Sequence, residues 1–236
     1  MPLEIACFTP ASAISASKAG ADRIELCANY AAGGVTPDIH SLLAIRREVG
    51  RDVPINVMIR PRAGDFVYST KEMEVMRHDI ALFTPLASGF VFGILDVNGR
   101  VDVARNSELV DIAAPLPCTF HRAVDEVGDL EGAVEMVVGC GFRSVLTSGG
   151  CSRAGNGVGR LKGLQERFAK RVDLIVGGGI RSGNVVEVKR GTGAIWVHSA
   201  AITGTGEEVD AEEIRRIKDA IDKEANGCDG DQEMAD

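Results

Sequence analysis

Strands and helices alternate strictly along this chain, and this alternation limits the available folds more than any other feature. Eight short apolar runs have the composition of buried parallel strands, and a helix-like stretch follows each of them. The predicted strands cover residues 3–8, 21–27, 54–60, 89–96, 118–124, 144–150, 172–179 and 194–200. This pattern predicts an α/β fold, a single (β/α)8 TIM barrel, whose usual size is about 250 residues. A doubly wound sheet is the alternative, although it rarely contains eight successive βα units.

The helix-like stretches predict a single domain with a short tail. They cover residues 10–20, 37–50, 69–87, 106–116, 129–141, 159–171, 182–193 and 210–226. The last one is amphipathic, with Ile214, Ile217 and Ile221 on one stripe. No Pro/Gly/Ser-rich linker interrupts the chain. We therefore expect a barrel domain over residues 1–224 and an acidic, disordered tail over residues 225–236.

Charge and composition exclude several classes of protein. A net charge of −8 argues against a nucleic-acid surface. The apolar runs are far shorter than the roughly 18 residues of a membrane span. The first ten residues, MPLEIACFTP, lack a basic segment, so we expect no signal peptide and a cytoplasmic location. In such a reducing compartment the cysteines at 7, 27, 118, 140, 151 and 228 are expected to be core thiols.

Three apolar strands end abruptly in charged residues. If Ile24 and Leu26 face the helices, strand alternation turns Glu25 and Cys27 into the barrel. The same rule turns Arg60 and His121 inward. Glu25, Arg60 and His121 are therefore candidate catalytic residues, with His121 as a proton shuttle. The alternative is a buried layer of ion pairs that only fills the barrel.

Further polar residues follow the same strand ends and are candidates for substrate binding. Arg62, Asp65, Arg122 and Asp125 would line the rim of the barrel mouth, or serve as solvated loop charges and helix caps. Gly178 and Gly179 end the seventh strand, and Ser199 ends the eighth. Loops after strands 7 and 8 often bind phosphate in such barrels, so these three residues form a candidate anion site. The glycines could also simply make a tight turn.

Several of these strings together resemble the CutC family of copper homeostasis proteins. They are GADRIELC, GGVTP, VMIRPRAGDFVYS, MRHDI, TFHRAVD, LTSGG and VGGGI, in this order over residues 3–200. The resemblance implies a (β/α)8 barrel, a cytoplasmic and in some members nuclear setting, homo-oligomers in some members, and a role in copper tolerance and copper binding. It implies no particular reaction.

The resemblance also implies copper ligands, which are cysteines on the first two strands. Cys27 matches one of these positions, whereas the other falls on Ala6, with Cys7 beside it. Alternation places Ala6 and Cys7 on opposite faces, although Cys7 could approach Cys27 if the strand bends. Intracellular Cu(I) prefers thiolate and thioether ligands, yet the chain has no CxxC motif, Met-rich tract or His cluster. Cys7 and Cys27 are thus candidate Cu(I) ligands or plain core residues.

Two functions of different class follow from the sequence. The first is a copper homeostasis protein that binds Cu(I). The second is an enzyme that acts on a small phosphorylated or carboxylated substrate by general acid/base catalysis. In that case Arg60 and Arg62 hold the anion, and Glu25 assists His121. A catalytically dead barrel that serves as an oligomeric scaffold is a weaker third possibility, because it leaves the converging charges without a purpose.

Overall fold

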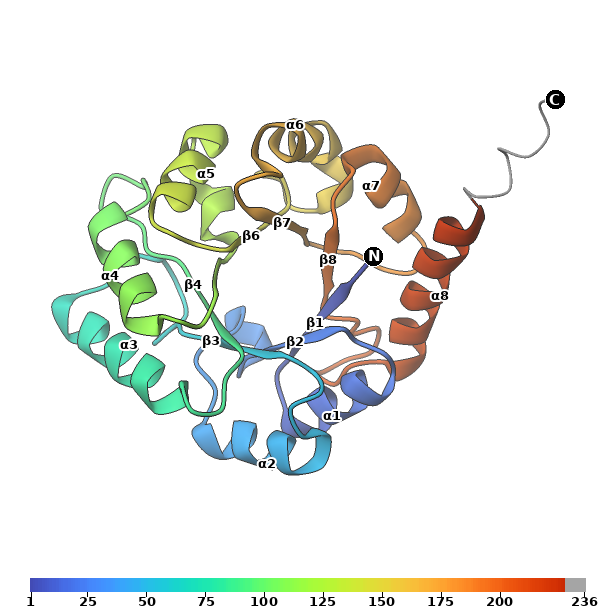
Figure 1. Ribbon diagram of the computed structural model, residues 1–236, viewed down its shortest axis with the longest axis horizontal. Helices are drawn as coiled ribbons and strands as arrows, with labels where there is room; N and C mark the ends of the chain where they lie inside the picture. Colours follow the sequence, from blue (N-terminus) through green and yellow to red (C-terminus); the bar gives the residue numbers. More distant parts are fainter. Residues whose placement is uncertain (228–236) are drawn as a thin grey trace.

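In the described part of the chain, eight parallel strands form a closed barrel. The barrel lies at the centre of the molecule (Figure 1). The structure is a computed structural model, and it describes residues 1–227. The predicted TIM barrel is confirmed, and each strand pairs with the next one in the chain until β8 closes on β1. The strands are β1 (Leu3–Cys7), β2 (Arg23–Leu26), β3 (Ile55–Met58), β4 (Gly89–Phe92), β5 (Cys118–Phe120), β6 (Ser144–Thr147), β7 (Asp173–Val176) and β8 (Trp196–Ser199).

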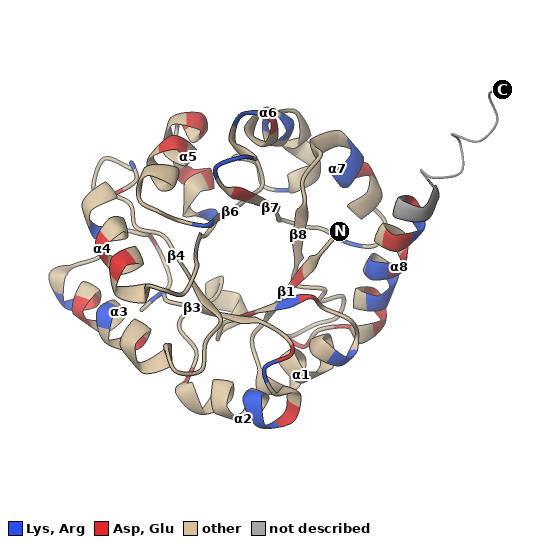
Figure 2. Ribbon diagram, in the orientation of Figure 1, with Lys and Arg blue, Asp and Glu red and all other residues tan. Residues whose placement is uncertain are grey.

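Within residues 1–227, eight α-helices surround the barrel. They are α1 (Pro10–Lys18), α2 (Ile39–Val49), α3 (Thr70–Phe83), α4 (Val103–Ala113), α5 (Leu130–Gly139), α6 (Val158–Phe168), α7 (Val185–Thr192) and α8 (Ala211–Gly227). Acidic and basic residues are interspersed along them (Figure 2). Helix α8 runs three residues past the domain boundary predicted at residue 224. The rest of the predicted tail, residues 228–236 with Cys228, lies outside the described residues.

The core follows from the alternation of side chains along each strand. Ile5, Ile24 and Val57 point to the helix side and are fully buried in one continuous apolar cluster. The opposite faces of the same strands carry Glu4, Glu25 and other polar groups into the barrel. A polar barrel interior is unusual, because branched aliphatic side chains normally fill it. The interior is therefore the part of this fold that needs a functional explanation.

The strands are shorter than predicted, and the fifth shows the reason most clearly. The fifth was predicted over 118–124, but β5 ends at Phe120 and a 3-10 helix (Arg122–Glu126) follows. His121 caps that helix, since its Nδ1 accepts a hydrogen bond from the amide of Ala123. The prediction was wrong for these residues because apolar Ala123 and Val124 continue the strand pattern while being buried in a turn.

No helix among residues 1–227 is long and apolar enough to cross a membrane. The five cysteines of this part of the chain, Cys7, Cys27, Cys118, Cys140 and Cys151, are all free.

Candidate functional site

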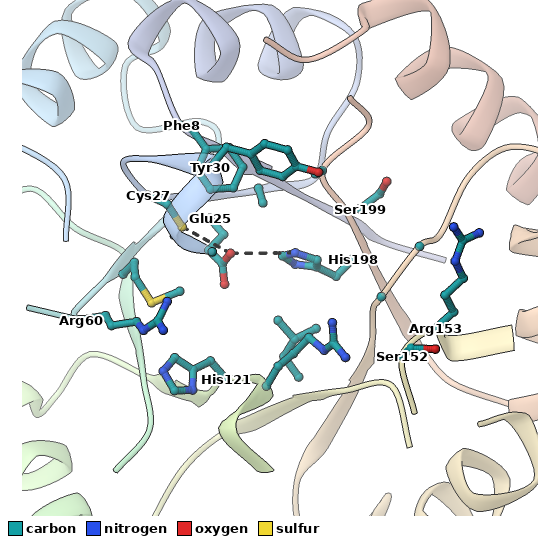
Figure 3. A pocket seen from close by; sticks show the side chains of 18 of the residues that line it. Phe8, Glu25, Cys27, Tyr30, Arg60, His121, Ser152, Arg153, His198 and Ser199 are labelled. Atoms are coloured by element: carbon teal, nitrogen blue, oxygen red, sulfur yellow. Dashed lines mark hydrogen bonds and ion pairs between the residues drawn. The ribbon is translucent and has the colours of Figure 1, made fainter. Parts of the chain in front are cut away.

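A cavity of about 520 Å³ opens where the strands end, and its walls carry most of the residues that the sequence singled out (Figure 3). Among the predicted site residues that line it are Glu25, Cys27, Arg60, His121, Arg122, Gly178, Gly179 and Ser199. The structure therefore brings together the predicted catalytic trio, one predicted copper ligand and the predicted anion site.

Four other predicted site residues do not line this cavity. Arg62 forms ion pairs with Asp65 and Glu72, at 2.8 and 2.6 Å, so its guanidinium stabilises the loop before α3. Asp65 lies in the same exposed loop, and Asp125 is hydrogen-bonded behind Arg122. Cys7 is fully buried in the apolar cluster between strands and helices.

His121 is buried and points into the cavity. Burial and the nearby Arg60 lower the pKa of its imidazole to about 3, so the ring is neutral at pH 7. Because Nδ1 accepts a hydrogen bond from Ala123, the neutral ring carries its proton on Nε2. That Nε2 is buried without a partner among the described residues. His121 therefore keeps one hydrogen-bond donor unused at the wall of the cavity.

Arg60 connects two loops of the barrel mouth. Its Nη1 donates to the carbonyls of Ala32 and Gly34, and its Nη2 donates to Gly64 at 2.8 Å. These bonds satisfy part of the guanidinium, but Nε has no partner in the described part of the chain. Arg60 therefore holds its loops in place and also brings a buried positive charge to the cavity.

Glu25 contacts a different histidine from the one expected. No hydrogen bond or ion pair within residues 1–227 joins Glu25 to His121. Instead, Glu25 Oε2 lies 3.9 Å from His198 Nε2. The other nitrogen of this ring, Nδ1, lies 2.8 Å from Oε1 of Glu4, and Glu4 Oε2 accepts from Arg23 Nε at 2.5 Å. The side chains of Arg23 on β2, Glu4 on β1, His198 on β8 and Glu25 on β2 thus form one buried chain of charged groups.

This chain shifts the pKa of its members. Burial raises the pKa of Glu25, and His198 offsets the effect only in part. Burial disfavours the imidazolium of His198, but Glu25 and Glu4 together raise its pKa. Although burial also acts on Glu4, His198 and Arg23 lower the pKa of its carboxyl group. A carboxyl group and an imidazole whose pKa values are both raised, and which line one cavity, are candidates for proton exchange with a bound molecule.

The same residues could also hold a metal ion. Ligand atoms of Glu4, Glu25 and His198 all lie within 4.8 Å of one another. Glu4, however, is already paired with Arg23 and with His198 Nδ1. A divalent ion bound there would have to compete with the guanidinium for the same carboxylate, whereas Glu25 Oε1 is buried without a partner in the described residues.

The two candidate copper ligands lie on opposite sides of the barrel wall. Cys27 lines the cavity and packs against Met58, whereas the Cys7 thiol bonds to the carbonyl of Ile5 in the outer core. Ala6, the position matched to the family cysteine, faces the cavity. Burial and then Glu25 raise the pKa of the Cys27 thiol well above its usual value, so the uncoordinated group is a thiol.

The sequence did not reveal three residues that line the cavity, His198, Arg153 and Arg181, or Glu4, which lies behind His198. Glu4 and His198 interrupt apolar strands at inward positions, so the alternation of β1 and β8 contained the signal. Arg153 and Arg181 lie on loops after β6 and β7, where no periodicity places a side chain. Ser182, where a helix was predicted to begin, is not free to bind a ligand. Its amide and its hydroxyl both donate to the carboxylate of Glu213, at 2.7 and 2.9 Å.

Comparisons with known proteins agree with this fold. The sequence model of the CutC family matches residues 1–203. The human protein named "Copper homeostasis protein cutC homolog" is 42% identical over 200 residues, which cover 84% of this chain and 72% of that protein. A CutC family protein of Chromobacterium violaceum is 34% identical, with 94% and 98% covered. The crystal structure of a CutC protein from Streptococcus agalactiae superposes with a TM-score of 0.80 at 29% identity, covering 85% of this chain and 98% of that one.

Proposed function

This chain belongs to the CutC family, and from the chemistry of its barrel mouth we propose that it is an enzyme that transfers a proton on a small anionic molecule. One observation carries the proposal. Glu25 Oε1, Arg60 Nε and His121 Nε2 belong to side chains lining one cavity, and all three atoms are buried without a hydrogen-bond partner in the described residues. Because such atoms cost about 1–3 kcal/mol each, a bound molecule that pairs with them is the simplest explanation.

The proposal gives each residue a role that suits its protonation state. Glu25, with its raised pKa, accepts a proton from the substrate and returns it to another substrate atom. Neutral His121 donates its Nε2–H to the substrate oxygen on which negative charge develops, and Arg60 adds a fixed positive charge nearby. His121 thus polarises the substrate, while His198 is the imidazole that accompanies Glu25.

The test is a screen of small phosphorylated and carboxylated metabolites for exchange of a carbon-bound hydrogen with deuterium in heavy water, followed by NMR. We expect Glu25→Gln to slow the exchange of a hit by about 100-fold or more, while its affinity changes by only a few-fold. Glu126→Gln is the matched control, since Glu126 is exposed and does not line the cavity. Equal rates in the two variants, or no exchange of any metabolite, would refute the enzyme.

Copper binding is the second candidate function, and the contact between Cys27 and Met58 favours it. A thiolate and a thioether are the ligands that Cu(I) prefers, and both side chains line the cavity. The human relative carries copper homeostasis in its name. In a Cu(I) titration against a competing chelator, Cys27→Ser should weaken binding more than tenfold. Cys118→Ser, in the outer core, should not. If Cys228→Ser abolishes copper binding and Cys27→Ser does not, copper does not bind in the cavity.

We also propose that the protein is cytoplasmic and that it forms homo-oligomers. Both are implied by the resemblance to the family, and the free cysteines of the described residues suit a reducing compartment. Cell fractionation and light scattering on the purified protein test the two statements.

A further inference from the structure

The wall of the cavity opposite Glu25 is rich in arginine. Arg122, Arg153 and Arg181 line it together with Gly178 and Gly179. Figure 3 shows Arg153 on the side of Ser152 and Ser199, across the cavity from Glu25 and Cys27. The protein carries a net charge of −8, so three guanidinium groups on one wall are a local feature and not a consequence of overall charge.

Hydrogen bonds hold the Arg122 side chain in place and leave one guanidinium nitrogen unused. Its Nε donates to Asp125 Oδ2 at 2.9 Å, and its Nη2 donates to Ser148 Oγ and to the carbonyl of Cys151. Asp125 is itself fixed by hydrogen bonds from the end of β6. The remaining nitrogen, Nη1, has no hydrogen bond within residues 1–227. It lies 3.5 Å from where a Cβ of Gly178 would be, so it faces the glycine turn.

The turn after β7 requires glycine at two consecutive positions. Gly178 and Gly179 have φ angles of +102° and +77°, which side-chain-bearing residues rarely adopt. The side chain of Arg153 packs over Gly179, with Cγ 3.4 Å from the missing Cβ, and its guanidinium has no hydrogen bond in the described chain. The amide groups of both glycines likewise have no acceptor among residues 1–227. Arg181 differs, because its guanidinium donates to Ser199 and to the carbonyls of Ile180 and Ile202.

We propose that Arg122, Arg153 and the Gly178–Gly179 turn form a subsite for the phosphate group of the substrate. This inference rests on the proposed function, because it assigns the substrate class for the same cavity. Two guanidinium groups from different loops and two free amides offer donors from several directions. A tetrahedral phosphate has enough acceptor oxygens to use them, whereas a planar carboxylate is satisfied by a single arginine. The reactive part of the molecule then lies toward Glu25, Arg60 and His121.

The experiment measures binding of inorganic phosphate and acetate to the full-length protein by calorimetry, at constant ionic strength. We expect phosphate to bind at least tenfold more tightly than acetate. Arg153→Ala should weaken phosphate binding at least tenfold, and its fold should be intact because the side chain makes no hydrogen bond in the described residues. Arg122→Lys keeps the charge but loses the fork, so it should weaken binding as well. Arg100→Ala, an exposed arginine outside the cavity at the same end of the barrel, is the control.

The results separate this subsite from the enzyme proposal. Equal affinity for phosphate and acetate, or equal losses in Arg153→Ala and Arg100→Ala, would overturn the subsite. The enzyme would still stand if a carboxylated molecule shows exchange that depends on Glu25. Conversely, phosphate binding that depends on Arg153 supports the subsite even if no metabolite reacts. A panel of triose to pentose phosphates then identifies the source: tighter binding than inorganic phosphate indicates an ester, and equal binding indicates the free ion.

Discussion

Replacing Asp125 by alanine should destabilise the protein far more than the loss of an ordinary surface carboxylate. The carboxylate of Asp125 accepts hydrogen bonds from the Thr147 hydroxyl, from the Ser148 amide and hydroxyl, and from the Gly150 amide. It also pairs with Arg122 at 2.9 Å, and its side chain is only 7% exposed. Asp125 therefore anchors the loop after β6 to the 3-10 helix after β5.

The magnitude follows from the donors that would lose their acceptor. A buried donor left unsatisfied costs about 1–3 kcal/mol, and two or three such donors after partial relaxation give about 3–5 kcal/mol. Loss of the ion pair with Arg122 adds little to this free-energy cost, because the Arg122 side chain is 40% exposed and stays solvated. Urea denaturation of the parent and the Asp125→Ala variant measures the difference in the free energy of unfolding. The matched control is Asp129→Ala, which removes a single exposed cap bond to the Gly132 amide and should cost about 1 kcal/mol. Equal losses in the two variants would refute the anchoring role.

Three further predictions concern the cavity. The raised pKa of His198 stabilises the fold fully below the ordinary value of 6.5, and this contribution is lost as the pH rises through the folded pKa. The unfolding free energy should fall over that range in the parent but not in His198→Gln, and identical pH profiles would contradict this. The ring of His121 should show no NMR titration between about pH 5 and 8, because its pKa is about 3; a midpoint near 6.5 would contradict its burial beside Arg60. Gly93→Ala should cost about 1–3 kcal/mol and reduce turnover, since its Cβ would lie 2.7 Å from His121 Nδ1; unchanged stability would show that the ring can move away.

The alternation of strands and helices was enough to predict the barrel, because each apolar run corresponds to one strand. Strand ends were less predictable. The run at 118–124 continues in buried Ala123 and Val124, which pack from a 3-10 turn and not from a strand. Apolar composition reports burial, and burial alone does not distinguish the last residue of a strand from the turn that follows it.

The alternation of side chains along each strand located part of the site, but it did not show which of these side chains contact one another. Alternation placed Glu25, Arg60 and His121 at the barrel mouth, and all three line the cavity. It did not give the partner of Glu25, because His198 reaches it only through closure of the barrel between β8 and β1. Glu4 and His198 are 194 residues apart in the chain. Arg153 was beyond prediction for another reason, since loop side chains follow no periodicity.

The closure of the barrel also determines the protonation of the site. Arg23 stacks over the Trp196 ring at 3.8 Å and pairs with Glu4, which keeps that carboxyl ionised. Ionised Glu4 binds Nδ1 of His198 and thereby turns Nε2 toward Glu25. The acid/base wall of the cavity is therefore built across the β1–β8 contact, whereas the arginine wall is built on loops after β5, β6 and β7. Under the proposed function, a molecule held by its phosphate at the arginine wall would present its other end to the acid/base wall, where a proton would be taken up and returned.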